Sequence, residues 1–310
     1  MNCKKDKMER LYKVAHMYYV KDYTQGEIAD ILKVSRPLVS RMLREARNLG
    51  IVEIRIHQPQ CDENSLLKQL CQKYGLQDGV LIPKSGNGYS VDQNLAHELL
   101  QYIEKIQPQC IGIGWGETIG MMAELLEQMP QLHTSVHTVC PLIGNSTVSM
   151  RTYHTDENVR MIAEGMSAQP KFLYAPAFPK DFTERDLLFQ TNHYRTICEQ
   201  WNQLDVAIIG IHEPSTALNI DCPLCYEGQS VGHMIGYSFD ADGNIICPEQ
   251  DYLIHIPLEK LKKCSKVIGI CASNVSVDTL VGALKTGLLT HIFTSESLVS
   301  AVLSNSWNHT

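Results

Sequence analysis

The sequence of 310 residues predicts an α/β protein with two domains, a small helical one over residues 1–57 and a larger one with a mostly parallel sheet over residues 58–310. Three observations support this prediction. Two short helix patterns joined by a turn lie between residues 24 and 46, basic residues concentrate in the same N-terminal part, and the rest of the chain alternates β-branched runs with amphipathic helix patterns.

The N-terminal helix pair carries sequence signals for both helix starts. Thr24 followed three residues later by Glu27 is a capping box, which predicts that the first helix begins at Thr24. Ser35 is a suitable cap for a second helix that begins at Arg36, because a proline follows within its first turn. Gly50 is expected to end that helix as a left-handed cap.

Apolar residues recur at helical spacing along both helices and predict one buried face. The set comprises Ile28, Ala29, Ile31, Leu32, Leu38, Val39, Met42, Leu43 and Ala46. A preceding helix over residues 8–19, with Leu11, Val14, Ala15 and Tyr18 on its apolar side, would supply the third helix on which such a pair packs. The run 51–57 alternates apolar and polar residues, which predicts a strand resembling the wing of a winged helix.

The second helix leaves basic and hydroxyl side chains outside its apolar face, namely Arg36, Ser40, Arg41, Arg44 and Arg47. Arginine pairs bidentately with guanine edges or phosphates, and a helix N-terminus adds backbone donors toward the DNA backbone. We therefore expect a winged helix-turn-helix that binds double-stranded DNA through Thr24, Gln25, Ser35, Arg36, Pro37, Ser40, Arg41 and Arg44. A solvated basic face on an ordinary helical hairpin is the alternative.

Charge divides the chain in the same way as the helix patterns. Residues 1–60 hold 12 Lys and Arg against 7 Asp and Glu, whereas the remaining residues hold 15 against 27. Only the N-terminal part is suited to a polyanion, so the acidic remainder is expected to recognise something other than DNA.

The lack of a long apolar run and the use of cysteine indicate the cellular compartment of the protein. No stretch of about 18 apolar residues is present and the N-terminus does not resemble a signal peptide, so we expect a cytoplasmic protein with no membrane association. The 11 cysteines are then expected to be reduced. Cys222 and Cys225 have a spacing that suits zinc or redox chemistry, but a second ligand pair is lacking. No metal site, cofactor or catalytic residue is expected.

The larger domain alternates short strand patterns with amphipathic helices, which indicates helices covering a mostly parallel sheet. Strands are predicted at residues 79–83, 110–114, 136–142, 207–211, 266–271 and 291–294, and helices at 63–74, 91–106, 117–128, 156–166 and 276–284. Such sheets bind ligands at the carboxyl ends of their strands. The loops at that edge are therefore where function is expected.

Three of these loops carry candidate binding residues. The strand-to-helix turn of Gly114, Trp115, Gly116, Glu117 and Thr118 presents backbone amides to an anion or a hydroxyl cluster, although its glycines are equally suited to closing the turn. The loop of Gly144, Asn145 and Ser146, with Arg151 and His154 close behind, is the second, and a plain turn is its simpler interpretation. The third loop contains Asp240, which either belongs to a hairpin turn or places its carboxylate on a sugar hydroxyl. His212 is a further candidate and follows another strand.

With these residues assembled, the chain resembles the SorC family of sugar-responsive bacterial transcriptional regulators over nearly its full length. The resemblance rests on short segments in matching order: Leu11–Ala15 with Tyr18 and Tyr19, the two helices around Thr24–Ala29 and Ser35–Arg41, Gly112–Thr118, Pro141–Gly144, Ala175–Phe178, Phe239–Gly243 and Leu284–Leu288. It implies a Rossmann-like effector domain of the sugar-phosphate isomerase and deaminase type, a sugar or sugar-phosphate effector, and a homo-oligomer, typically a tetramer.

Two departures from the family pattern concern the ligand. Asn145 stands where a second glycine is frequent, and residues 272–276 lack the lysine that many members place near the sugar phosphate. A phosphate held without that ammonium loses roughly 1.5–3 kcal/mol. The sequence therefore leaves open a phosphorylated sugar, a free sugar or a polyol. An isomerase or deaminase that uses Asp240, Glu117 or His212 is the alternative function, since such catalysis needs a carboxylate base with an acid partner.

Overall fold

The computed structural model describes residues 2–52, 65–83, 90–128, 132–214, 229–246, 252–271 and 275–305. Within the chain two compact units separate, Met1–Asp62 and Glu63–Thr310. In the described residues, no helix combines the length and the apolar composition needed to cross a membrane.

The N-terminal unit consists of three helices, α1 (Asn2–Tyr19), α2 (Gln25–Leu32) and α3 (Arg36–Asn48). They enclose a small core of buried residues from all three helices, namely Leu11, Val14, Ala15, Met17, Ile28, Ala29, Val39, Met42, Leu43 and Ala46. The predicted helix pair and its supporting helix are thereby confirmed. The predicted wing strand falls largely on residues 53–57, outside the described residues.

Two details of this unit differ from prediction. Ser35 takes the N-cap position of α3 but its side chain makes no capping hydrogen bond, whereas Thr24 and Glu27 form the complete capping box of α2. Ile31, predicted on the buried face, is 53% exposed. Ile28 and Ala29 already fill the buried side of this short helix, which leaves Ile31 facing solvent. Gly50, with φ +70°, adopts the left-handed conformation expected just beyond α3.

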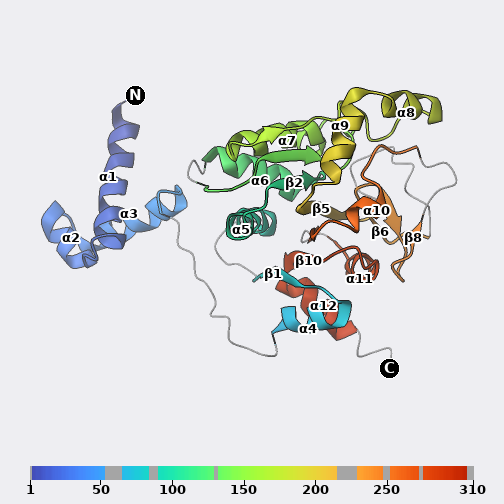
Figure 1. The fold of residues 1–310 in the computed structure, drawn as a ribbon. Coiled ribbons are helices and arrows are strands. Elements are labelled where there is room, and N and C mark those ends of the chain that lie inside the picture. Colours follow the sequence, from blue (N-terminus) through green and yellow to red (C-terminus); the bar gives the residue numbers. More distant parts are fainter. Residues whose placement is uncertain are drawn as a thin grey trace. The chain divides into compact units, whose positions relative to one another are not determined.

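The larger unit is an α/β domain, as predicted, in which the strand patterns form one sheet (Figure 1). Its strands are β1 (Asp78–Ile82), β2 (Cys110–Ile113), β3 (Thr138–Pro141), β4 (Gln169–Pro170), β5 (Val206–His212), β6 (Gly232–Met234), β7 (Tyr237–Phe239), β8 (Ile245–Ile246), β9 (Lys266–Cys271) and β10 (His291–Ser295). In the described residues the parallel strands follow the order β1-β10-β9-β5-β2-β3-β4, and β6, β7 and β8 continue from β5 as antiparallel strands.

Helices cover both faces of this sheet. They are α4 (Leu66–Tyr74), α5 (Val91–Ile106), α6 (Glu117–Gln128), η1 (Arg151–Tyr153), α7 (Thr155–Gly165), α8 (Phe182–Phe189), α9 (Asn192–Trp201), α10 (Leu258–Leu261), α11 (Val277–Lys285) and α12 (Glu296–Asn305). The predicted helix boundaries at 91–106 and 117–128 are confirmed. The helices α8, α9, α10 and α12, the 3-10 turn η1 and the strands β4 and β6 to β8 were not predicted as elements.

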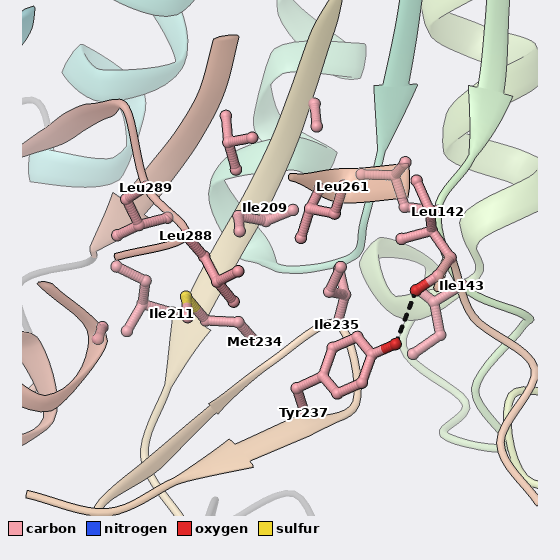
Figure 2. Close-up of a cluster of buried hydrophobic side chains, with 14 of the residues drawn as sticks. Leu142, Ile143, Ile209, Ile211, Met234, Ile235, Tyr237, Leu261, Leu288 and Leu289 are labelled. Atoms are coloured by element: carbon pink, nitrogen blue, oxygen red, sulfur yellow. Dashed lines mark hydrogen bonds between the residues drawn. The ribbon is translucent and has the colours of Figure 1, made fainter. Parts of the chain in front are cut away.

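Burial along β5 shows how the two faces are filled. Val206 and Ile208 pack among residues of α5, α6 and α7, whereas Ile209 and Ile211 pack on the opposite face. Figure 2 shows the second face, where Ile209 and Ile211 lie among side chains of β6 and of the segment before β10. There the Tyr237 hydroxyl donates a hydrogen bond of 2.9 Å to the Ile256 carbonyl. Because β5 is buried on both sides, its polar residues appear only where the strand ends.

Candidate functional site

The strand order places a topological switch point between β2 and β5. From β2 the chain continues outward to β3 and β4, and it then returns to β5 on the other side of β2 before continuing to β9. Loops that leave two such strands run in opposite directions and leave a crevice at the carboxyl ends, which is the usual ligand position in sheets of this kind. The Gly114–Thr118 turn follows β2 and His212 ends β5, so two predicted parts of the site meet here.

The Gly114–Thr118 turn is fixed by its neighbours on β5 and η1. The Gly114 amide donates to the Ile208 carbonyl at 2.9 Å and the Gly116 amide donates to the Thr152 carbonyl at 3.3 Å. Gly116 has φ +134°, and a Cβ added there would lie 3.2 Å from Cε1 of His212. Glycine is therefore favoured at position 116, both by the backbone conformation and by the close approach of the imidazole.

Two imidazoles lie side by side at this end of β5. His212 and His233 are register partners on β5 and β6, and their rings stack with centroids 5.2 Å apart. Nε2 of His212 and Nδ1 of His233 are buried, and neither atom has a hydrogen-bond partner among the described residues. Buried polar atoms without a partner are uncommon, so these two are candidates for bonds to a ligand.

Burial also sets the charge of both rings. It lowers the pKa of His212 to about 4, and a hydrogen bond between the ring and the Trp115 backbone acts in the opposite direction. Burial and the proximity of His212 lower the pKa of His233 to about 3. Both imidazoles are therefore neutral at physiological pH, and each ring offers one donor and one acceptor nitrogen.

Further unpartnered groups surround the same turn. Within the part of the chain that the structure describes, the buried Nε1 of Trp115 and Oγ1 of Thr152 also have no hydrogen-bond partner. Tyr153, buried in η1, lies with its ring centroid 6.5 Å from that of Trp115 and 6.3 Å from that of His212. Burial, together with the carboxylates of Glu117 and Asp92, raises the pKa of Tyr153 to about 12, so its hydroxyl stays protonated. The result is a set of neutral hydrogen-bonding groups.

Carboxylates stand at the two helix starts next to this set. Asp92 is in the first turn of α5 and accepts a hydrogen bond of 2.7 Å from the buried Thr118 hydroxyl, while Glu117 begins α6 and is exposed. Thr118, a predicted ligand-binding residue, therefore already bonds to Asp92. This contact ties the start of α5 to the turn after β2.

The loop of Gly144, Asn145 and Ser146 uses its polar groups internally. The Asn145 side chain exchanges two hydrogen bonds of 2.9 Å with the side chain and amide of Asp156. The Gly144 carbonyl accepts from Thr155 at 3.1 Å, and Ser146 Oγ accepts from the Val148 amide at 3.2 Å. These contacts fit the turn interpretation of this loop.

Three other predicted residues are engaged or placed elsewhere. Arg151 is half exposed and forms an ion pair of 2.7 Å with Glu124. His154 takes the N-cap position of α7 without a side-chain capping bond. Asp240 lies in the hairpin between β7 and β8, where its carboxylate accepts three hydrogen bonds of 2.9 Å from Asp242 and Asn244. These bonds lower the pKa of Asp240 and match the hairpin interpretation.

Sequence patterns had not indicated Asp92, Thr152, Tyr153 or His233 as site residues. They come from a helix start, a short 3-10 turn and a strand of the antiparallel extension. No local motif marks them, because only the packing of α5 and η1 on the turn after β2 brings them together.

The N-terminal unit presents its predicted DNA-binding residues as follows. Arg36, Pro37, Arg41 and Arg44 are exposed on α3, whereas Ser40 is half-buried. Thr24 is exposed at the start of α2, and Gln25 follows it in a hollow that is also lined by Tyr18, Tyr23 and Arg36. The exposed arginines agree with an outward basic stripe on α3.

The described residues contain no group of three or more His, Cys, Asp or Glu side chains placed to hold a metal ion. Cys222 and Cys225, whose spacing suggested zinc or redox chemistry, lie outside the described residues. The cysteines described at positions 110, 140, 264 and 271 are buried thiols.

Comparison with known proteins identifies the family. The family model described as a putative sugar-binding domain matches residues 58–304. The chain belongs to this family. The SorC-type resemblance inferred from the sequence is confirmed at the same time by relatives that align along most of their length.

Among these relatives is the sorbitol operon regulator of Klebsiella pneumoniae, 27% identical over 90% of this chain and 92% of that protein. The deoxyribonucleoside regulator of Bacillus subtilis is 26% identical over 97% of this chain and 99% of its own length. The crystal structure of the full-length sorbitol operon regulator from Klebsiella pneumoniae superposes with a TM-score of 0.75 at 24% identity, covering 95% of this chain and 98% of that one. The last comparison shows that the fold is shared.

Proposed function

We propose that this protein is a sugar-responsive transcriptional regulator that binds operator DNA through residues 1–57 and an effector through residues 58–310. The observation that carries the proposal is the membership of residues 58–304 in a sugar-binding family, behind an N-terminal unit whose third helix exposes arginines. The named relatives are regulators of a sorbitol operon and of deoxyribonucleosides, which supports a carbohydrate-related effector.

The effector is proposed to bind at the switch point between β2 and β5. Support comes from the unpartnered atoms of Trp115, Thr152, His212 and His233, which surround the Gly114–Thr118 turn. Sugar hydroxyls both donate and accept hydrogen bonds, so neutral imidazole, indole and hydroxyl groups are suitable partners. In this proposal Gly144, Asn145 and Ser146 support the loop rather than contact the ligand, and Asp240 holds its hairpin.

Regulation requires that the effector distinguish two arrangements of the protein. A ligand shifts operator affinity only if it binds one arrangement better than the other. We propose that the arrangements differ in the spacing of the DNA-binding units within a homo-oligomer, with the tetramer of the SorC family as the expected assembly.

An enzymatic role as an isomerase or deaminase has less support. That chemistry needs a free carboxylate base with a partner acid. The carboxylate of Asp240 is bonded within its hairpin, and the lowered pKa of His212 makes this ring a poor base at neutral pH. Glu117, the third candidate, is exposed at the start of α6. We therefore propose regulation and not catalysis.

An electrophoretic mobility shift on the DNA upstream of the protein's own transcription unit tests this function. Sugars, polyols, sugar phosphates, a chelator and an oxidant are added in turn. We expect a specific complex whose amount changes with a sugar or polyol and is insensitive to chelator and oxidant. Turnover of a sugar phosphate by the purified protein, with a DNA complex insensitive to every compound, would contradict the proposal.

A further inference from the structure

Acidic side chains occupy the helix N-termini that meet at the carboxyl edge of the sheet. Asp92 is in the first turn of α5, Glu117 in that of α6 and Asp278 in that of α11. Helix N-termini are the usual binding positions for phosphate, since their free amides and dipole favour negative charge. Here that favourable field already acts on carboxylates of the protein itself.

Glu213 adds a fourth carboxylate and uses it directly at the start of α11. It follows His212 at the end of β5, and its Oε1 accepts a hydrogen bond of 2.5 Å from the Ser276 amide. The same oxygen lies 3.2 Å from Oγ1 of the buried Thr279. This carboxylate thus takes the backbone donor at the N-cap of α11 that a ligand phosphate would otherwise use.

The charges acting at the strand ends are correspondingly negative. The Tyr153 hydroxyl lies in the field of Glu117 and Asp92, and the thiol of Cys271, at the end of β9, lies in that of Glu213 and Asp92. Arg151, which the sequence suggested for this site, is paired instead with Glu124. A phosphate dianion placed here would be repelled by these carboxylates.

We propose that the effector is an uncharged polyhydroxyl compound, a free sugar or polyol, and that Glu213 together with Asp92 and Glu117 excludes phosphorylated sugars. The neutral groups on Trp115, Thr152, His212 and His233 supply hydrogen-bond partners for hydroxyls, and the carboxylates accept from hydroxyls while repelling phosphate. This inference rests on the proposed function, because it names the ligand class of the same site.

Isothermal titration calorimetry on the full-length protein tests this with matched pairs: sorbitol and sorbitol 6-phosphate, fructose and fructose 6-phosphate, ribose and ribose 5-phosphate, together with inorganic phosphate. We expect the uncharged member of a pair to bind at least tenfold more tightly than its phosphate ester. Inorganic phosphate at millimolar concentration should neither bind nor compete. Tighter binding of any phosphate ester than of its parent sugar, or competition by inorganic phosphate, would overturn the inference.

The variant Glu213→Gln keeps an oxygen that can accept from Ser276 and removes the charge. In this variant, the ratio of the affinity for the uncharged sugar to the affinity for its phosphate ester should fall by about tenfold. Glu164→Gln removes the same charge from the exposed last turn of α7 and should leave the preference unchanged. An unchanged preference in both variants would contradict the role of Glu213. Binding of an uncharged sugar that leaves the operator complex unaltered would refute the proposed regulatory function and still support this ligand class.

Discussion

His212 and His233 each have one fully buried ring nitrogen, and they lie opposite each other where β5 pairs with β6. Their pKa values, about 4 and about 3, lie below the ordinary value for histidine because burial disfavours the charged ring. Such rings make hydrogen bonds without carrying a charge. Because they bind protons more weakly in the folded state than in the unfolded state, the stability of the fold depends on pH.

We expect the larger unit to lose stability as the pH falls. Because the folded-state pKa of His212 is below the unfolded value of about 6.5, its contribution is complete above pH 6.5 and is lost as the pH falls toward 4. His212 alone should lower the free energy of unfolding by about 3 kcal/mol over that range. Urea unfolding at pH 7, 5.5 and 4.5 measures this loss. A free energy of unfolding that is constant across this range would contradict the assignment, and His193→Gln, at an exposed position, should not alter the pH dependence.

On α3, Arg41 is the arginine whose substitution is most informative. Arg41→Ala should weaken specific operator binding by about 1–3 kcal/mol if the guanidinium contacts a base edge. Fluorescence anisotropy with operator and scrambled duplexes at several salt concentrations measures this. An equal loss on both duplexes, with a shallower salt dependence, would assign Arg41 to phosphate instead. Arg10→Ala, on the exposed surface of α1, serves as the control and should change neither quantity.

At the level of single residues, the sequence could indicate candidate site residues only where the chain itself places them together. The Gly114–Thr118 turn is contiguous, and His212 follows a clear strand pattern. Tyr153 and His233 could not be predicted, because their proximity to His212 depends on how η1 and β6 pack. For Asp240 the sequence left two interpretations, and the hydrogen bonds of its carboxylate favour the hairpin.

At the scale of the element, α2 and α3 begin in chemically different ways. The side chain of Thr24 accepts a hydrogen bond from the Glu27 amide at 3.3 Å, and the Glu27 carboxylate accepts one from the Thr24 amide at 2.7 Å. Ser35 makes no such bond. The two N-caps therefore form a natural pair for comparison.

Thr24→Ala should destabilise the N-terminal unit by about 1 kcal/mol, because it removes one half of the capping box. Ser35→Ala should change stability by less than about 0.5 kcal/mol, since no capping bond is lost. Circular dichroism during thermal unfolding compares the two variants. Equal destabilisation by both would show that Ser35 does cap α3.

The turn between β2 and α6 offers a second test at this scale. Gly116→Ala should reduce effector affinity at least tenfold, because the left-handed backbone and the 3.2 Å approach to His212 both resist a Cβ. Gly75→Ala, at φ +74° in open space beyond α4, is the matched control. It should lower stability by a similar amount and leave affinity unchanged in calorimetry. An affinity in Gly116→Ala equal to that of the wild type would remove this turn from the site.

Helices with clear periodicity, such as α5 and α6, could be predicted to the residue, whereas α8 could not. In the structure α8 has no buried residue, so its sequence carries little of the apolar alternation on which such predictions depend. The strands β6, β7 and β8 are only two or three residues long, which is too short for a period-two pattern.

For the molecule as a whole, alternating strand and helix patterns were sufficient to predict a mostly parallel sheet. The strand order was not predictable, because each pattern specifies an element and not its neighbours. That order places the switch point between β2 and β5, and this is why the proposed site lies at the loops that follow these two strands.

We propose that an uncharged sugar or polyol bound at this switch point controls DNA binding by residues 1–57. The most direct test is the operator affinity of the full-length protein, measured by fluorescence anisotropy with and without a saturating sugar that calorimetry has shown to bind. We predict a change in operator affinity of about 5-fold to 150-fold, the range typical of coupled sites, and its loss in Gly116→Ala. The same operator affinity with and without the bound sugar would contradict the account.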